Sequence, residues 1–224
     1  MMLTLKHALT AVVLMFIIAV TLADLSSSTL AMDFSILTMP DGLHVVFADG
    51  EIVAGDAEHL RIALQSADRD TFGNKDIALN SGGGLVSAAF AIVALMDQDK
   101  ITTIVPPGAT CASACAQIVF VAGVHRVVLD GARLGIHTCS INGDSSPLCN
   151  QIIADNAFEH GVPYGSVMAF MKYTGPSQMI WFNSQQADCY GLTRWPPGFN
   201  RGPQPGEAPC VMEEIRKSFG MPGK

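Results

Sequence analysis

One short stretch of the sequence, C-A-S-A-C, sets Ser113 between Cys111 and Cys115, and an almost wholly apolar run follows it. A serine at this place can cap the helix that the apolar run would form, by accepting a hydrogen bond from a backbone N–H group. It can also act as a nucleophile, provided that a base takes the proton of its hydroxyl. His137 ends the expected strand L-G-I-H and is the candidate base, although a lone histidine there is also typical of a hydrogen-bonded core residue.

The loop L-N-S-G-G-G, from Leu79 to Gly84, closes one expected strand and opens a helix. Consecutive glycines permit backbone angles that other residues avoid, and they let peptide N–H groups face a ligand. The loop has neither the spacing of a dinucleotide-binding fingerprint nor the G-K-S/T of a phosphate loop. It therefore indicates either a tight strand–helix turn alone or a donor to an oxyanion, which the helix N-terminus behind Ser113 would also stabilise.

The first residues predict export. A weakly basic start is followed by an uncharged apolar run up to residue 22, and Thr21 and Ala23 supply the small residues that a signal peptidase reads. We expect cleavage after Ala23 and a periplasmic or secreted protein. A membrane anchor formed by residues 8–23 is the alternative, although the run is short for a span.

Export changes the meaning of the six cysteines, because an even number in an oxidising compartment predicts disulfides. Cys139 and Cys149 flank a polar loop, and Cys189 and Cys210 would hold the Pro/Gly-rich tail. Cys111 and Cys115 are the two that remain, although either could pair elsewhere in the fold. The expected pairs are Cys139–Cys149, Cys189–Cys210 and Cys111–Cys115. Zinc bound by the C-x3-C motif with His137 and Cys139 is the alternative, but its spacing matches no standard zinc motif. We expect no metal and no other cofactor.

Strand and helix patterns alternate through the middle of the chain, which predicts an α/β fold with parallel strands covered by helices. The expected strands are Ser35–Met39, Leu43–Ala48, Asp76–Leu79, Ile101–Val105, Val127–Leu129 and Leu134–His137. One expected helix begins near Asp56. The others cover Leu85–Met96, Ala114–Ala122, Pro147–His160, Pro163–Tyr173 and Ser184–Tyr190. The helix over Leu85–Met96 is apolar on most sides, which indicates cover by other layers or by another subunit.

The composition is that of one folded domain, with 49% hydrophobic and 15% charged residues in 224. The net charge of -7 and the lack of a basic cluster exclude nucleic acid as a partner. We divide the chain into a signal peptide (1–23), a flexible lead (24–34), one domain (35–194) and a Pro/Gly-rich tail with a short C-terminal helix (195–224).

Four motifs in order resemble the ClpP/crotonase superfamily: N-S-G-G-G-L, C-A-S-A-C-A, A-R-L-G-I-H and A-D-C-Y-G-L. The likeness runs from about Val45 to Leu192 and is nearest to the Clp-type serine peptidases and their exported relatives. It implies a spiral of β-β-α units with a helical C-terminal arm. It also implies Ser113 as nucleophile, His137 as base, and the amides of Gly83 and Ala114 as oxyanion hole.

The chain departs from the family at its third catalytic residue. The position of the family's aspartate falls on or near Met179, which cannot orient an imidazole. Asn183 or Asp188 could replace it, or Ser113 and His137 could work as a dyad, and the sequence does not choose.

The resulting hypothesis is an exported serine hydrolase, a peptidase that works through an acyl-enzyme on peptides or proteins. The resemblance implies a homo-oligomer, and export implies that no ATPase partner assists. Two alternatives stay open: a crotonase-type enzyme acting on acyl thioesters, and a catalytically silent binding or assembly module that kept the fold.

Overall fold

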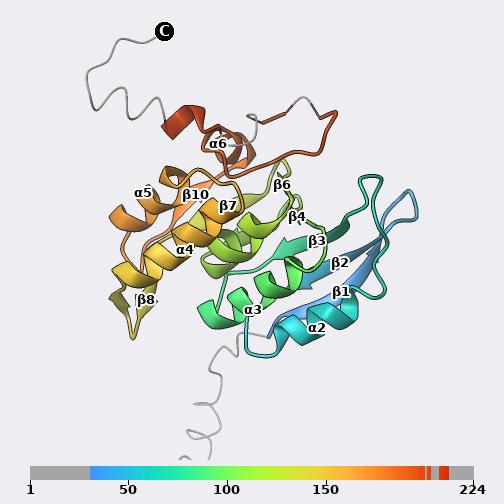
Figure 1. Ribbon diagram of the computed structural model, residues 1–224, viewed down its shortest axis with the longest axis horizontal. Coiled ribbons are helices and arrows are strands. Elements are labelled where there is room, and N and C mark those ends of the chain that lie inside the picture. Colours follow the sequence, from blue (N-terminus) through green and yellow to red (C-terminus); the bar gives the residue numbers. More distant parts are fainter. Residues whose placement is uncertain (1–30, 200, 203–206, 212–224) are drawn as a thin grey trace, which may run out of the picture. The chain divides into compact units, whose positions relative to one another are not determined.

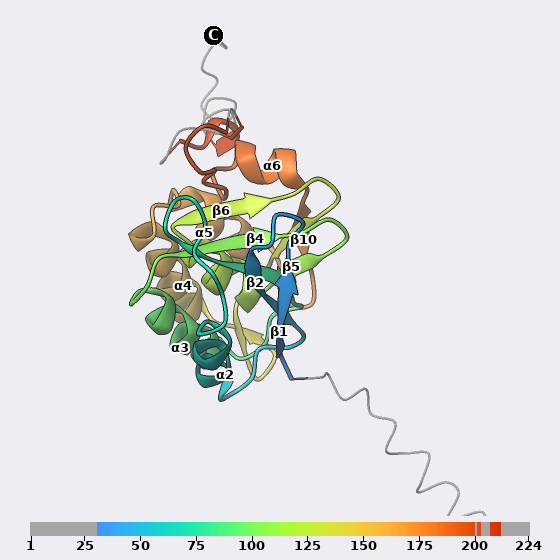
Figure 2. The same cartoon turned by 90° about the vertical axis from the view of Figure 1, so that its right-hand side faces the viewer.

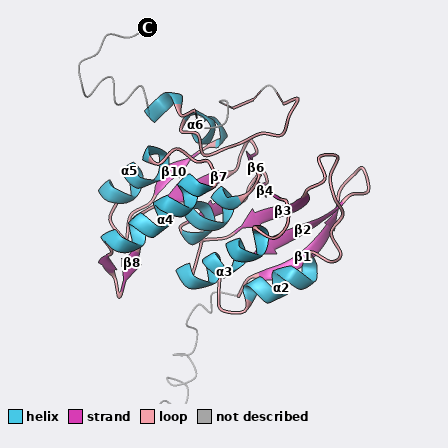
Figure 3. Cartoon of the chain, viewed as in Figure 1, coloured by secondary structure: helices cyan, strands magenta, loops and turns pink. Residues whose placement is uncertain are grey.

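The structure, a computed structural model, describes residues 31–199, 201–202 and 207–211. The expected signal peptide, its alternative as an anchor, and most of the lead and tail lie outside the described residues. The described chain from Ala31 onward is a mixed α/β unit, and Figures 1 and 3 show its helices and strands.

The elements follow one another as short strands and helices. The first part contains β1 (Asp33–Thr38), β2 (His44–Asp49), α2 (Asp56–Ala63), β3 (Lys75–Asn80), α3 (Val86–Met96) and β4 (Ile101–Val105). The middle contains β5 (Thr110–Ala112), a π-helical turn η1 (Cys115–Val119), a 3-10 turn η2 (Phe120–Ala122), β6 (His125–Val128) and β7 (Arg133–Ile136). The last part contains β8 (Ser140–Ile141), β9 (Asp144–Ser145), α4 (Pro147–Glu159), α5 (Gly165–Tyr173), β10 (Ile180–Phe182) and α6 (Ser184–Cys189).

The larger sheet has the order β1-β2-β3-β4-β6. β1 and β2 form an antiparallel hairpin, and Gly42 in its turn has a φ of 90°, which a glycine adopts without steric cost. The remaining neighbours pair in parallel, as the alternation of strand and helix predicts. Figure 2 shows α2, α3 and α4 on one side of the strands.

The core lies between this sheet and its helices. Ile77 and Leu79 of β3 and Ile92 of α3 are each 1% exposed and belong to one hydrophobic cluster. The inner face of α3 fills this core, whereas Ser87 and Ala91 on its outer face are exposed.

A second, smaller sheet has the order β10-β7-β5, and β8 and β9 pair as a separate two-stranded sheet. β5 runs parallel to β7, and β10 runs antiparallel to it. A single bridge between Ser81, just after β3, and Cys111 of β5 joins the two sheets. This bridge brings the glycine loop after β3 next to the C-A-S-A-C stretch after β5.

Two expectations about element bounds need correction. The first strand begins at Asp33, and Met32 already donates its N–H to the Glu51 carbonyl at 2.8 Å, so the lead is shorter than expected. The helix expected over Ala114–Ala122 is instead a π-helical turn followed by a 3-10 turn. Its wider first turn carries Gln117 to the backbone of His137, where Gln117 Oε1 accepts the His137 N–H at 3.2 Å. π-helical turns of this kind are frequent at functional sites.

The buried Arg126 of β6 ties the C-terminal arm to the sheet. Its guanidinium donates only to backbone carbonyls, among them Leu192 at 2.9 Å, Gly123 at 3.1 Å and His160 at 3.0 Å. Burial lowers the pKa of this guanidinium to about 9. Arginine gives no sign of such a role in the sequence, because most arginines lie on the surface.

Candidate active site

Ser113 occupies a sharp turn between β5 and η1. Its φ of 53° is left-handed, a conformation that residues with a Cβ rarely adopt. Its N–H donates to the Gly135 carbonyl and its own carbonyl accepts the first helical bond from Gln117, both at 2.9 Å. A strained strand-to-helix turn that exposes a serine hydroxyl is typical of serine hydrolases.

The side chain of Ser113 reaches His137. Its Oγ lies 2.7 Å from His137 Nε2, within the distance expected for a nucleophile and its base. The expectation that the hydroxyl also caps the helix is wrong, since the turn has no side-chain cap bond and the hydroxyl is engaged by the imidazole.

A disulfide closes around the serine. Cys111 and Cys115 are bonded and both fully buried, so the strand end and the first helical turn are held together two residues on each side of Ser113. Because this bond occupies both thiols, the zinc alternative for the C-x3-C motif is wrong.

The other two expected disulfides are also found. Cys139 pairs with Cys149 and Cys189 pairs with Cys210, so all three pairings are confirmed and the structure contains no free cysteine. Three disulfides indicate an oxidising, extracellular or periplasmic environment. Among the described residues, none of the helices combines the length and the apolar character that crossing a membrane requires.

His137 is oriented by a backbone carbonyl. Its Nδ1 lies 3.0 Å from the oxygen of Pro176, in the segment between α5 and β10. Because a carbonyl oxygen only accepts, Nδ1 carries the ring proton, and Nε2 is left to accept the proton of the Ser113 hydroxyl. The tautomer follows from this pair of contacts and is the one that a general base needs.

The three side chains considered for the third catalytic residue all lie elsewhere. Met179 packs on β7, where a Cβ on Gly135 would meet its Sδ at 2.8 Å. Asn183 caps α6 by accepting the Gln186 N–H at 2.9 Å. Asp188 accepts hydrogen bonds from Thr193, Trp195 and Arg201 in the C-terminal arm.

Sequence reasoning missed the Pro176 carbonyl, because every residue carries a carbonyl and no residue type marks this one. The strand β10, which was not expected, pairs with β7 and brings the loop that contains Pro176 beside His137.

The two predicted oxyanion donors differ in whether their N–H groups already have an acceptor. The Ala114 N–H precedes the first helical bond, which starts at the Gln117 N–H, so it has no acceptor within the helix. Gly83 lies against the nucleophile, since a Cβ on it would be 2.6 Å from Ser113 Cβ. Its N–H, however, already donates to Ser81 Oγ at 3.1 Å. The Gly83 amide is thus engaged by Ser81 in this structure, and its role as an oxyanion donor stays a prediction.

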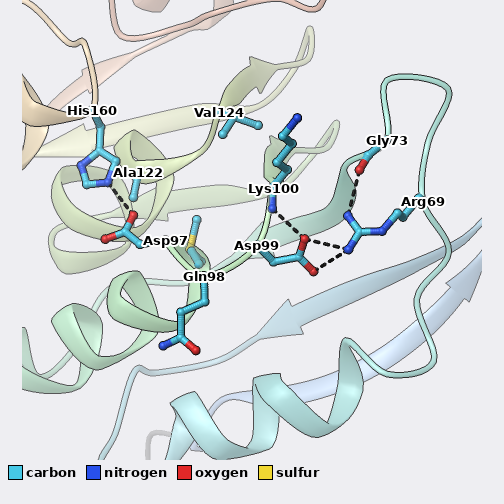
Figure 4. A pocket seen from close by; sticks show the side chains of 10 residues that line it. Arg69, Gly73, Asp97, Gln98, Asp99, Lys100, Ala122, Val124 and His160 are labelled. Atoms are coloured by element: carbon cyan, nitrogen blue, oxygen red, sulfur yellow. Dashed lines mark hydrogen bonds and ion pairs between the residues drawn. The ribbon is translucent and has the colours of Figure 1, made fainter.

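A cavity of about 560 Å³ lies apart from these residues, at the C-terminal end of α3. Figure 4 shows two ion pairs among its charged side chains, Arg69 with Asp99 and His160 with Asp97. It offers no nucleophile beside a free base, so the chemistry of the molecule points to Ser113 and His137 instead.

Comparison of the chain with protein-family models and with curated protein sequences finds no match. The argument for function therefore rests on the geometry of the site.

Proposed function

We propose that this protein is an exported serine hydrolase of the ClpP/crotonase type, a peptidase that works through an acyl-enzyme. The observation that carries the proposal is the 2.7 Å contact between Ser113 Oγ and His137 Nε2, combined with the bond from Nδ1 to the Pro176 carbonyl. A hydroxyl, a base in the required tautomer and a strained turn that presents them are the parts that acyl transfer needs.

In the first half of the reaction, His137 Nε2 takes the proton of the Ser113 hydroxyl while Oγ attacks the carbonyl carbon of the substrate. The charge that develops on the carbonyl oxygen is stabilised by the Ala114 N–H at the start of the helix. The imidazolium then gives its proton to the leaving amine, the C–N bond breaks, and an ester on Ser113 remains.

In the second half, His137 removes a proton from water, and the oxygen of that water attacks the ester carbon. Oγ leaves, takes the proton back from His137, and a carboxylic acid is released. The Pro176 carbonyl holds the ring throughout, but its partial charge stabilises the imidazolium less than a carboxylate would. We therefore expect a slower enzyme than one with a complete triad.

The finer fold assignment belongs to the same proposal. A spiral of β-β-α units with a helical C-terminal arm is supported by two sheets joined end to end through the Ser81 and Cys111 bridge. Peptide or protein substrates, the absence of an ATPase partner and assembly into a homo-oligomer are parts of the proposal that follow from the resemblance and from export.

One observation favours a second candidate function, a catalytically silent binding module. The Gly83 N–H is bonded to Ser81 Oγ, and the far nitrogen of His137 faces a carbonyl in place of a carboxylate. A relic of an active site would have both features.

Labelling with a fluorophosphonate separates the two candidates, because the reagent reacts only with an activated serine. We expect the full chain to be labelled, Ser113→Ala to lose all labelling, and His137→Ala to react about 1000-fold more slowly or worse, since no base remains. Ser81→Ala is the matched control: it deletes a hydroxyl in the neighbouring loop and should be labelled at least as fast as the unchanged protein. Equal labelling of the unchanged protein and Ser113→Ala, or none of either, rejects the hydrolase.

A further inference from the structure

The outer face of the smaller sheet continues directly from the Ser113 and His137 pair. Leu134 and Ile136 of β7 are buried in the core at 1% and 2% exposure. Because side chains alternate along a strand, Arg133, Gly135 and His137 lie on the opposite face. Arg133 is exposed, so this face is open at the end away from the catalytic pair.

Arg133 is a cation without a carboxylate. Its guanidinium lies 4.8 Å from the ring centroid of Trp181, and none of the ion pairs found within the described residues includes it. Stacking on an aromatic face leaves the N–H edge of a guanidinium free, and that edge matches the two oxygens of a carboxylate.

An apolar floor connects Arg133 with His137. A Cβ on Gly135 would meet Met179 Sδ at 2.8 Å and Trp181 Cζ3 at 2.9 Å, so both side chains lie directly over this glycine. Trp181 remains 39% exposed. The floor can therefore receive an apolar side chain between the catalytic pair and the cation.

The length of this strip fits an extended peptide. Arg133 and His137 are four positions apart, and a strand rises about 3.3 Å per residue, so the strip is about 13 Å long. A peptide lying extended along β7 spans that length with about four residues.

We infer that this strip selects an extended peptide whose apolar side chain packs on Met179 and Trp181 and whose Asp or Glu side chain binds Arg133 about four residues from the reacting carbonyl. The inference rests on the proposed function and names its substrate class. The charge complementarity is specific: the chain as a whole carries -7, so an acidic peptide is attracted to this unpaired cation and not to the protein surface in general.

Binding to the full-length Ser113→Ala variant tests the selection without requiring catalysis. The probes are dye-labelled, amidated heptapeptides of alanine with one leucine and, two residues before or after it, either glutamate or glutamine, because Gly135 under the apolar floor lies two positions from Arg133 on β7. Fluorescence anisotropy should show one glutamate peptide binding about tenfold more tightly than its glutamine partner, as a charge-assisted bond would give.

Variants assign that preference to its residue. Adding Arg133→Gln should make the glutamate and glutamine peptides bind equally, and Arg133→Lys should keep part of the difference. Arg61→Gln on α2 is the matched control, since Arg61 is exposed but paired with Glu58 at 2.7 Å, and it should leave the preference unchanged. Equal affinity for both peptides, no binding of either, or a preference that survives Arg133→Gln overturns the inference.

The two proposals fail separately. Fluorophosphonate labelling does not require Arg133, so labelling without a preference for glutamate leaves the hydrolase and removes the acidic subsite. A preference for glutamate that Arg133→Gln abolishes, in a protein that no fluorophosphonate labels, supports the subsite and rejects the hydrolase.

Discussion

Two strand-to-helix turns lie side by side in this molecule, and each begins with a serine. In the turn after β3, glycines carry the unusual backbone angles, with a φ of 102° at Gly83 and 146° at Gly84. Ser81 uses its hydroxyl locally, as the acceptor of the Gly83 N–H. The turn after β5 has no glycine, and the left-handed conformation falls on Ser113 itself.

The difference shows what holds Ser113, the proposed nucleophile, in its conformation. A residue with a Cβ in the left-handed region is unfavourable by about 1–2 kcal/mol, so surrounding structure must hold it there. The Cys111–Cys115 disulfide and the bond from the Ser113 N–H to the Gly135 carbonyl do so. The hydroxyl is then directed away from its own backbone, toward a histidine 24 residues later.

Gly83→Ala should have the largest effect on stability and on labelling, because its side chain would disturb both turns. The new Cβ would lie 2.6 Å from Ser113 Cβ and 2.8 Å from the Ala112 oxygen, at a φ that disfavours any side chain. We expect a loss of about 2–4 kcal/mol in the free energy of unfolding and labelling at least about 100-fold slower.

Gly82→Ala is its control, since a Cβ there meets nothing within 4 Å. Denaturant unfolding and the labelling rate measure both effects. A stable, rapidly labelled Gly83→Ala protein would show that the two turns are independent.

Removing the Cys111–Cys115 bond should have a smaller effect, concentrated on reactivity. Such a short loop stabilises the fold by about 2 kcal/mol, but it also fixes the backbone of the nucleophile. The variant with both cysteines changed to alanine should therefore lose about 2 kcal/mol and label about tenfold more slowly or worse.

Changing Cys139 and Cys149 to alanine instead opens a longer loop of 10 residues in sequence. It should cost about 3 kcal/mol and leave labelling unchanged at temperatures where the protein stays folded. If the two double variants lose the same proportion of their labelling rate, the bond around Ser113 has no special role in positioning it.

The smallest effect concerns Asp76 on β3, in the sheet that carries the first turn. Burial first, and then the charge of Asp70, raise the pKa of Asp76 from 3.8 to about 6. The folded state thus holds the proton more tightly than the unfolded state. The resulting stability is fully present below pH 3.8 and is lost as the pH rises to 6.

Asp76→Asn should consequently gain about 1 kcal/mol at pH 7.5 and nothing near pH 3.5, a figure reduced from the full shift because the carboxyl is partly exposed. Unfolding curves at the two pH values measure it. The labelling rate at pH 7.5 should not change. A gain that is equal at both pH values would mean that burial of a charge at Asp76 is not the cause.

Much of the larger sheet could be predicted, because local patterns specify it. The turn P-D-G makes the hairpin, and apolar runs separated by a helix length require parallel strands, as found from β2 to β6. The polar loop between Cys139 and Cys149 and the tail after Cys189 indicated two of the disulfides, and Cys111–Cys115 was the pair that remained. Ser113 and His137 were identified by residue type together with a resemblance, and their contact needed the fold.

What the sequence by itself determined is thus the strands of the larger sheet, most of the helices, the disulfides and the residues able to react, whereas β5 and β10 of the smaller sheet were not expected. Only the tertiary structure decided which backbone groups complete the site. The carbonyl of Pro176 faces His137 because of the path of the chain between α5 and β10, and the Gly83 amide faces Ser81 because of the local shape of its turn. Backbone carbonyls and amides are chemically the same at almost every residue, so no side-chain type marks the one that is used. Their roles depend on their positions in space, and only the long-range pairing of β7 with β10 and with β5 fixes those positions.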